Sequence, residues 1–203
     1  MSQKVILTAD LIQSRTGTSD LGSIKSLTLW GQRLGDVSIV RFLTQVETLA
    51  LTMNNISSLK PFMHCKNLKE LYLRRNAIEN LEDVRYLANL ENLEELWLGD
   101  NPCAAKESYR LYVLHYLPQL KKLDMEEVTD EERILARNFD PGDKEEEVVA
   151  EETVEPRVAK LGFGAPNAAE KVLYAAIALV DSLDVKGIEV VLKHCQGKLR
   201  DRK

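Results

Sequence analysis

The chain is poor in cysteine, proline and aromatic residues. Its 203 residues include three cysteines and six prolines, and aromatic side chains make up 6%. Cys65, Cys103 and Cys195 lie far apart with no Cys-x-x-Cys pair, so we predict neither a disulfide framework nor a zinc site. Unpaired cysteines are typical of a reducing compartment. We therefore expect a cytoplasmic protein.

Long hydrophobic runs are also missing. The first 14 residues contain only three consecutive apolar residues, Val5–Leu7, whereas a secretory signal needs roughly 7–15. The apolar run at residues 172–180 (VLYAAIALV) is nine residues long, well short of the ~20 that a membrane-spanning helix requires. We therefore expect no membrane insertion.

Acidic charge is concentrated in one segment. Residues 1–124 carry 15 basic and 14 acidic side chains, whereas residues 125–160 carry 5 and 13. The net charge of −5 therefore reflects a single acidic stretch. Because the rest of the chain has no strong basic excess, we expect it not to bind nucleic acid.

Motifs that carry chemistry are absent from the sequence. His64-Cys65, His115 and His194-Cys195 do not have metal-ligand spacing. No serine or cysteine has a recognisable partner base, and no glycine-rich loop could hold a phosphate. We therefore predict that the protein is not an enzyme and has no cofactor and no metal site.

An internal repeat dominates the first part of the chain. The pattern L-x-x-L-x-L-x-x-N-x-L begins at Ile24, Val46, Leu68 and Leu93, and a truncated fifth copy begins at Leu117. Repeats of this length are typical of a solenoid in which each unit adds one strand. The fold class is thus an α/β leucine-rich-repeat solenoid. Its short parallel sheet lies on the concave side and helical turns lie on the convex side.

Each part of the repeat has an expected place. Alternate leucines of the L-x-L core point inward from a short strand. The repeat asparagine satisfies backbone groups where the strand turns, and Gln32 takes its position in the first copy. We predict that residues 109–124 form a helix and a last leucine pair, which together cap the C-terminal end of the solenoid. Residues 7–12 are expected to cap the other end.

The outward positions of the strands carry unusual residues for a solvent-facing sheet. Trp, Tyr and Arg are the types most enriched in binding hot spots. Two alternatives remain: Trp30 could pack on the N-terminal cap, and Arg74 could pair with Glu95. The predicted protein-binding face comprises Trp30, Met53, Glu70, Tyr72, Arg74, Arg75, Glu95, Trp97 and Asp100.

After residue 125 the repeat pattern ends. We divide the chain into a repeat domain with its caps (1–125), an acidic disordered linker (126–165) and a helical oligomerisation domain (166–203). The linker contains charge runs such as DKEEEVVAEETVE, which are typical of solvated chain. It is either a plain spacer or a binding site for a basic partner.

The last segment predicts a small all-α helical hairpin. About forty residues rarely bury an all-round apolar helix alone, so the hairpin either self-associates or packs onto the solenoid, and we favour self-association. The residues expected to form the oligomer interface are Val172, Leu173, Ala176, Ile177, Val180, Leu183, Ile188, Val191, Leu192, Cys195 and Leu199.

The repeats resemble the SDS22-like class of leucine-rich repeats. More narrowly, the chain resembles a family of cilia- and flagella-associated proteins in which such a domain precedes a C-terminal helical domain. The segments that carry this resemblance are residues 5–9, Trp30-Gly31 with Arg33-Leu34, 71–76 (LYLRRN), 96–98 (LWL) with Asn101-Pro102-Cys103, 109–124 and 172–189.

This resemblance implies an adaptor of the cytoskeleton, at the basal body and the cilium or flagellum. It also implies a role in cilium formation or maintenance, a NIMA-related protein kinase among the partners, and an oligomerising C-terminal domain. We therefore predict a non-catalytic scaffold for protein–protein interactions.

Three other classes of protein contain repeats of this kind and are alternatives to this prediction. An SDS22-type phosphatase-regulating subunit normally has more repeats. A nuclear acidic leucine-rich-repeat protein would end on its acidic run. An axonemal dynein-associated light chain has no need of an oligomerising tail.

Overall fold

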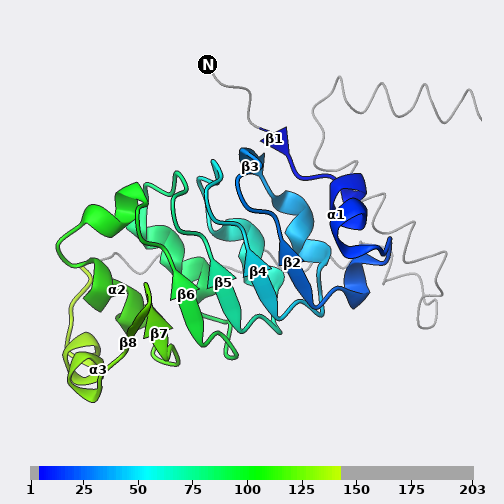
Figure 1. Cartoon of the computed structure of the whole chain (residues 1–203). Helices are drawn as coiled ribbons and strands as arrows, with labels where there is room; N and C mark the ends of the chain where they lie inside the picture. The colour runs from blue at the N-terminus through cyan, green and yellow to red at the C-terminus, as the bar shows by residue number, and fades with distance from the viewer. Residues whose placement is uncertain (1–4, 143–203) are drawn as a thin grey trace, which may run out of the picture. The chain divides into compact units, whose positions relative to one another are not determined.

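The computed structural model describes residues 5–142. Its main element is a six-stranded sheet of very short strands, laid side by side in Figure 1. Successive strands from β2 to β7 pair in parallel, and β8 turns back antiparallel to β7. In order across the sheet the strands are β2 (Ser26–Thr28), β4 (Thr48–Ala50), β5 (Glu70–Tyr72), β6 (Glu95–Trp97), β7 (Lys122–Leu123) and β8 (Glu126–Glu127).

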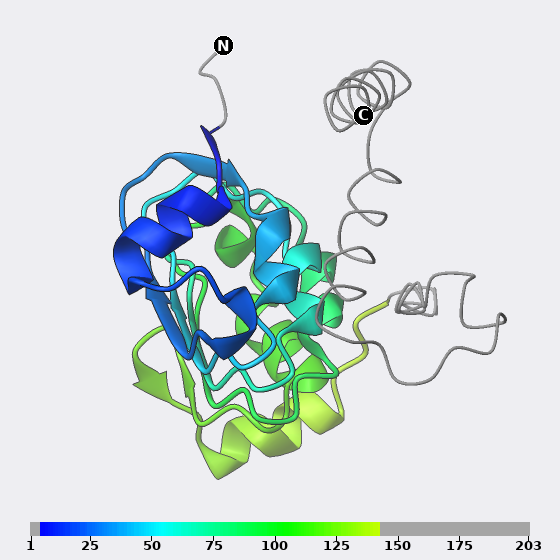
Figure 2. The same ribbon diagram turned by 90° about the vertical axis from the view of Figure 1, so that its right-hand side faces the viewer.

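Tight 3-10 helical turns form the opposite layer, as Figures 1 and 2 show. The 25-residue step between the third and fourth repeats is accommodated here, because η4 has seven residues where η2 and η3 have five. The leucine-rich-repeat fold that the pattern predicts is confirmed. The turns are η1 (Leu21–Ser23), η2 (Ser38–Phe42), η3 (Lys60–His64), η4 (Leu81–Leu87) and η5 (Pro102–Ala105).

Leucine rows fill the space between the two layers. Leu27, Leu49, Leu71, Leu96 and Leu123 are register partners on successive strands, and all are buried. Every apolar position of the repeat pattern from the second copy onward is likewise buried. The core therefore runs through the domain as one continuous column.

Three asparagines, of which Asn54 and Asn101 are buried and Asn76 is half-buried, tie each repeat to the one before it. The Asn54 side chain accepts from Leu34 N at 3.0 Å and donates to Leu29 O at 2.9 Å and to Leu51 O at 2.8 Å. Asn76 and Asn101 make the same three bonds one and two repeats further on. These three residues form the asparagine ladder.

The residue before the ladder position has left-handed backbone geometry in every repeat. Gly31 occupies it in the first repeat with φ 68°, and Met53, Arg75 and Asp100 follow with φ 55–58°. Glycine adopts this conformation at little cost, whereas other residues are strained in it. The turn that points the asparagine inward is thus kept in all four repeats despite the strain.

The N-terminal cap forms where the sequence predicts it. Strand β1 (Val5–Ile6) pairs with β3 (Leu34–Asp36), and helix α1 (Ala9–Thr16) lies across the first repeat in Figure 2. The Thr8 hydroxyl accepts from Leu11 N and so caps α1. Leu7 and Ile12 are buried against the repeats.

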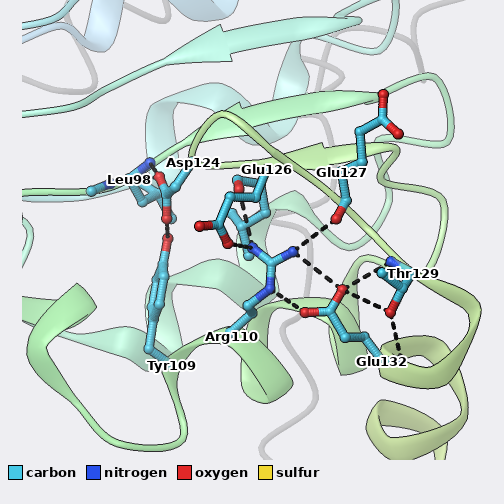
Figure 3. A network of polar contacts seen from close by, with 10 residues as sticks. Leu98, Tyr109, Arg110, Asp124, Glu126, Glu127, Thr129 and Glu132 are labelled. Atoms are coloured by element: carbon cyan, nitrogen blue, oxygen red, sulfur yellow. Dashed lines mark hydrogen bonds and ion pairs between the residues drawn. The ribbon is translucent and has the colours of Figure 1, made fainter.

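The C-terminal cap is larger than the sequence predicts. Helix α2 (Tyr109–Tyr116) covers the last full repeat, as expected. The Asp124 carboxylate then replaces the backbone carbonyl that bonds the equivalent amide in earlier repeats, because it accepts from Leu98 N and Gly99 N, both at 2.7 Å. Its second oxygen accepts from the Tyr109 hydroxyl at 2.6 Å (Figure 3).

The boundary that we placed between repeat domain and linker at residue 125 is therefore too early. Helix α3 (Asp130–Arg137) belongs to the domain, since Ala136 is buried and Arg133 donates to the carbonyls of Pro118 and Leu120. The later linker residues and the predicted oligomerisation segment 166–203 lie outside the described residues.

Figure 3 shows how α3 is held. The Arg110 guanidinium donates to Glu132, to Leu123 O at 3.1 Å and to Glu127 O at 3.2 Å. Glu132 also accepts from Thr129 N at 2.9 Å, while the Thr129 hydroxyl accepts from Glu132 N, which completes a capping box. The Arg110 bond holds the pKa of Glu132 down at about 2.

The asparagine ladder should dominate stability. We expect Asn54→Ala to lower the free energy of unfolding by about 3 kcal/mol, because three backbone partners lose their bonds inside the domain. Gln32→Ala is the matched control: its amide only donates to Trp30 O, at 3.1 Å, so its cost should be below about 0.5 kcal/mol. Urea denaturation measures both, and equal effects would contradict the ladder's role.

The Arg110–Glu132 pair should make stability depend on pH. The pKa of Glu132 is lower in the folded chain than its ordinary 4.5, so the pair stabilises the fold fully above pH 4.5. That contribution is lost as the pH falls toward 2. Thermal melts of the wild type and Glu132→Gln should therefore differ at pH 7, differ less at pH 3, and converge only at about pH 2 or below. A constant difference would contradict this prediction.

Candidate protein-binding surface

An aromatic pair lies at the centre of the exposed sheet face. Tyr72 of β5 and Trp97 of β6 are register partners, and their rings meet edge to face with centroids 4.8 Å apart. Each polar tip binds a carboxylate on its own strand. The Tyr72 hydroxyl donates to Glu70 at 3.1 Å, and the Trp97 Nε1 donates to Glu95 at 2.9 Å. We call these four residues the acid–aromatic cluster.

The two carboxylates of this cluster are held by neutral donors. Glu70 also accepts from the Thr48 hydroxyl at 3.2 Å. Neither Glu70 nor Glu95 takes part in an ion pair within residues 5–142. Burial, followed by the two nearby carboxylates, raises the pKa of Tyr72. Its hydroxyl therefore remains a hydrogen-bond donor at neutral pH.

Arg74 and Arg75 lie where β5 ends and share one carboxylate. Their Nε atoms approach Asp100 Oδ2 at 2.9 Å and 3.1 Å, and these bonds lower the pKa of Asp100. The alternative in which Arg74 pairs with Glu95 is therefore wrong. Two guanidinium groups therefore share one carboxylate at this edge of the face.

Trp30 and Met53 are the exposed apolar residues at the N-terminal half of the face. Trp30 is 61% exposed and Met53 is 40% exposed. The alternative that places Trp30 against the N-terminal cap is therefore wrong. Both side chains offer apolar area to a partner.

A hollow beside Trp97 extends the face toward the C-terminal cap. It has a volume of about 160 Å³ and is lined by Arg74, Trp97, Gly99, Asp100, Asp124 and Met125. Repeat reasoning did not find Asp124 and Met125, because they follow the last leucine of the truncated copy. Both have left-handed backbone geometry, as in the two-residue turn of a β-hairpin, and they join β7 to the antiparallel β8.

Both cysteines of the described part of the chain, Cys65 and Cys103, are buried. Burial raises the pKa of Cys65 to about 12 and that of Cys103 to about 11, so both thiols stay protonated at neutral pH. Residues 5–142 contain no group of three side chains that could hold a metal ion. None of the helices in this range is both long and apolar enough to cross a membrane.

The parallel strands and 3-10 turns of successive repeats are those of a known class of repeat protein. A family model described as "Leucine-rich repeat" matches residues 32–153. The chain therefore belongs to the leucine-rich-repeat family.

Among curated relatives, it is similar to the human and the mouse "Cilia- and flagella-associated protein 410". Each is 40% identical over 163 residues, which is 79% of this chain. The chain spans 60% of the length of the human relative and 62% of that of the mouse relative.

A solved structure supports the same fold. The match is to "Crystal structure of Drosophila melanogaster SNF/U2A' complex", with a TM-score of 0.55 and 23% identity. It covers 66% of this chain and 92% of the matched chain. At this identity the likeness concerns the fold alone.

The exposed apolar residues should be dispensable for folding. Trp30→Ala is expected to change the free energy of unfolding by no more than about 0.5 kcal/mol, because its side chain is mostly in solvent. Leu29→Ala, one position earlier and buried, should cost about 2–5 kcal/mol. Chemical denaturation compares the two, and a large cost at Trp30 would show a structural role instead.

Proposed function

We propose that this protein is a non-catalytic adaptor of the cilium or flagellum, and that its exposed sheet face binds another protein. One observation carries the proposal: Tyr72, Trp97 and their carboxylates lie in the middle of the sheet, on a face that no other described element covers in Figures 1 and 2. Residues of these types combine contact area with fixed polar groups, as binding hot spots do. The cellular setting is suggested by the human and mouse relatives, which are cilia- and flagella-associated proteins.

The acid and base pattern of the face suits a protein partner better than a nucleic acid. Glu70 and Glu95 are the first residues of β5 and β6 and bond the aromatic side chains. Arg74 and Arg75 follow the end of β5 and share Asp100. A phosphate backbone needs a continuous cationic track. This face instead places carboxylates and guanidinium groups close together, a mixture that suits the charged side chains of a protein segment.

Self-association through residues 166–203 remains a prediction, as do the basal-body location and the kinase partner. If the tail does oligomerise, it would present several binding faces on one particle. Linked copies raise avidity without any new contact. Weak binding at each face would then suffice for stable attachment.

The test replaces the central pair in the full chain. Tagged Tyr72→Ala/Trp97→Ala protein, expressed in ciliated cells in place of the endogenous copy, should lose cilium association and fail to restore normal cilia. The control Glu79→Ala/Glu91→Ala changes two exposed residues outside the strands and should behave as wild type. Fluorescence imaging and cilium counts give both readouts, and normal behaviour of the first variant would refute the proposal.

A further inference from the structure

Glu70 and Glu95 face each other across neighbouring strands. They are register partners on β5 and β6, and like charges placed directly opposite in a sheet are destabilising. The row one residue earlier shows the opposite arrangement. It alternates in sign from repeat to repeat through Lys25, Glu47, Lys69, Glu94 and Lys121.

Ion pairs neutralise that neighbouring row. Lys69 binds Glu47 at 2.6 Å, Lys25 lies 3.7 Å from the same carboxylate, and Lys121 binds Glu94 at 2.8 Å. Lys122 is the register partner of Glu95 on β7, yet the two form no ion pair. The chain thus pairs its charges in the neighbouring row, whereas Glu70 and Glu95 form no ion pair among residues 5–142.

The hydrogen bonds of the cluster leave each carboxylate one free oxygen. Thr48 and Tyr72 both donate to Oε2 of Glu70, and Trp97 donates to Oε1 of Glu95. The other oxygen of each carboxylate accepts no hydrogen bond within residues 5–142. Two half-buried anions therefore stand beside two aromatic rings, each with an oxygen available to an outside donor.

We propose that the acid–aromatic cluster binds an arginine side chain of a protein partner. A guanidinium stacks on an indole or phenol ring and donates in its plane to carboxylates, whereas a lysine ammonium can do only part of this. The bound cation would also relieve the repulsion between Glu70 and Glu95. This assignment rests on the proposed function, since it names the chemistry that the sheet face recognises.

The chain's two tryptophans allow a direct test. We titrate the nitrogen-15-labelled full chain with the capped peptide Gly-Gly-Arg-Gly-Gly and follow both indole N–H resonances by NMR. The Trp97 resonance should shift saturably, while Trp30, which has no carboxylate partner, should stay in place. The same peptide with citrulline, a neutral isostere of arginine, should bind at least about tenfold more weakly. Equal binding of the two peptides, or tighter binding of a lysine peptide, would overturn the proposal.

Charge-neutral variants separate binding from folding. Glu70→Gln/Glu95→Gln keeps a carbonyl oxygen for each hydroxyl or indole donor, so it should fold with an unchanged or higher melting temperature. Its dissociation constant for the arginine peptide should rise about tenfold or more. Glu94→Gln, which breaks the exposed pair with Lys121, is the matched control and should bind as wild type. Wild-type affinity in the double variant would contradict the proposal.

The ciliary assay distinguishes this inference from the proposed function. If the Tyr72→Ala/Trp97→Ala protein fails in cells but Glu70→Gln/Glu95→Gln succeeds, the face binds a protein without using an arginine, and only the inference falls. If both variants succeed, the sheet face is not the functional surface and both proposals fall. Failure of both, with the Glu94→Gln control active, supports both.

Discussion

Strands of three residues are too short to form a stable sheet by backbone pairing alone, and the asparagine ladder supplies what they lack. Each side chain of Asn54, Asn76 and Asn101 ties two carbonyls and one amide across adjacent repeats. The ladder fixes both the spacing of the strands and their register. That register sets Tyr72 against Trp97 and Glu70 against Glu95, so the chemistry of the exposed face depends on amides buried behind it.

Most of this arrangement could be predicted from the sequence, because repeat position decides which way a side chain points. The pattern predicts that the leucines point inward and that the asparagines bond backbone groups, and the structure shows both. The remaining strand positions are then expected to lie on the exposed face of the sheet. What the pattern could not decide was how side chains pair on the surface. Arg74 had Glu95 and Asp100 within reach, and only the positive-φ turn at Asp100 brings that carboxylate to both arginines.

The C-terminal cap shows a different failure. The run from Glu126 to Glu132 is rich in acid, and composition alone assigned it to a solvated linker. Local chemistry outweighs composition here, because Thr129 and Glu132 form a capping box that starts α3. The cation that pairs with Glu132 is Arg110, which lies more than twenty positions earlier in the chain. A single-sequence pattern search has no means of pairing residues at that separation.

The alternating row of Lys25, Glu47, Lys69, Glu94 and Lys121 constrains how such a protein can evolve. Solenoids usually lengthen or shorten when one repeat is duplicated or deleted. Removing one internal repeat here would bring two lysines or two glutamates together, and copying one would do the same. Removing or adding two repeats at once would preserve the alternation. The alternating row therefore favours changes of repeat number in steps of two. It does so through exposed ion pairs that each contribute little to the stability of a single repeat.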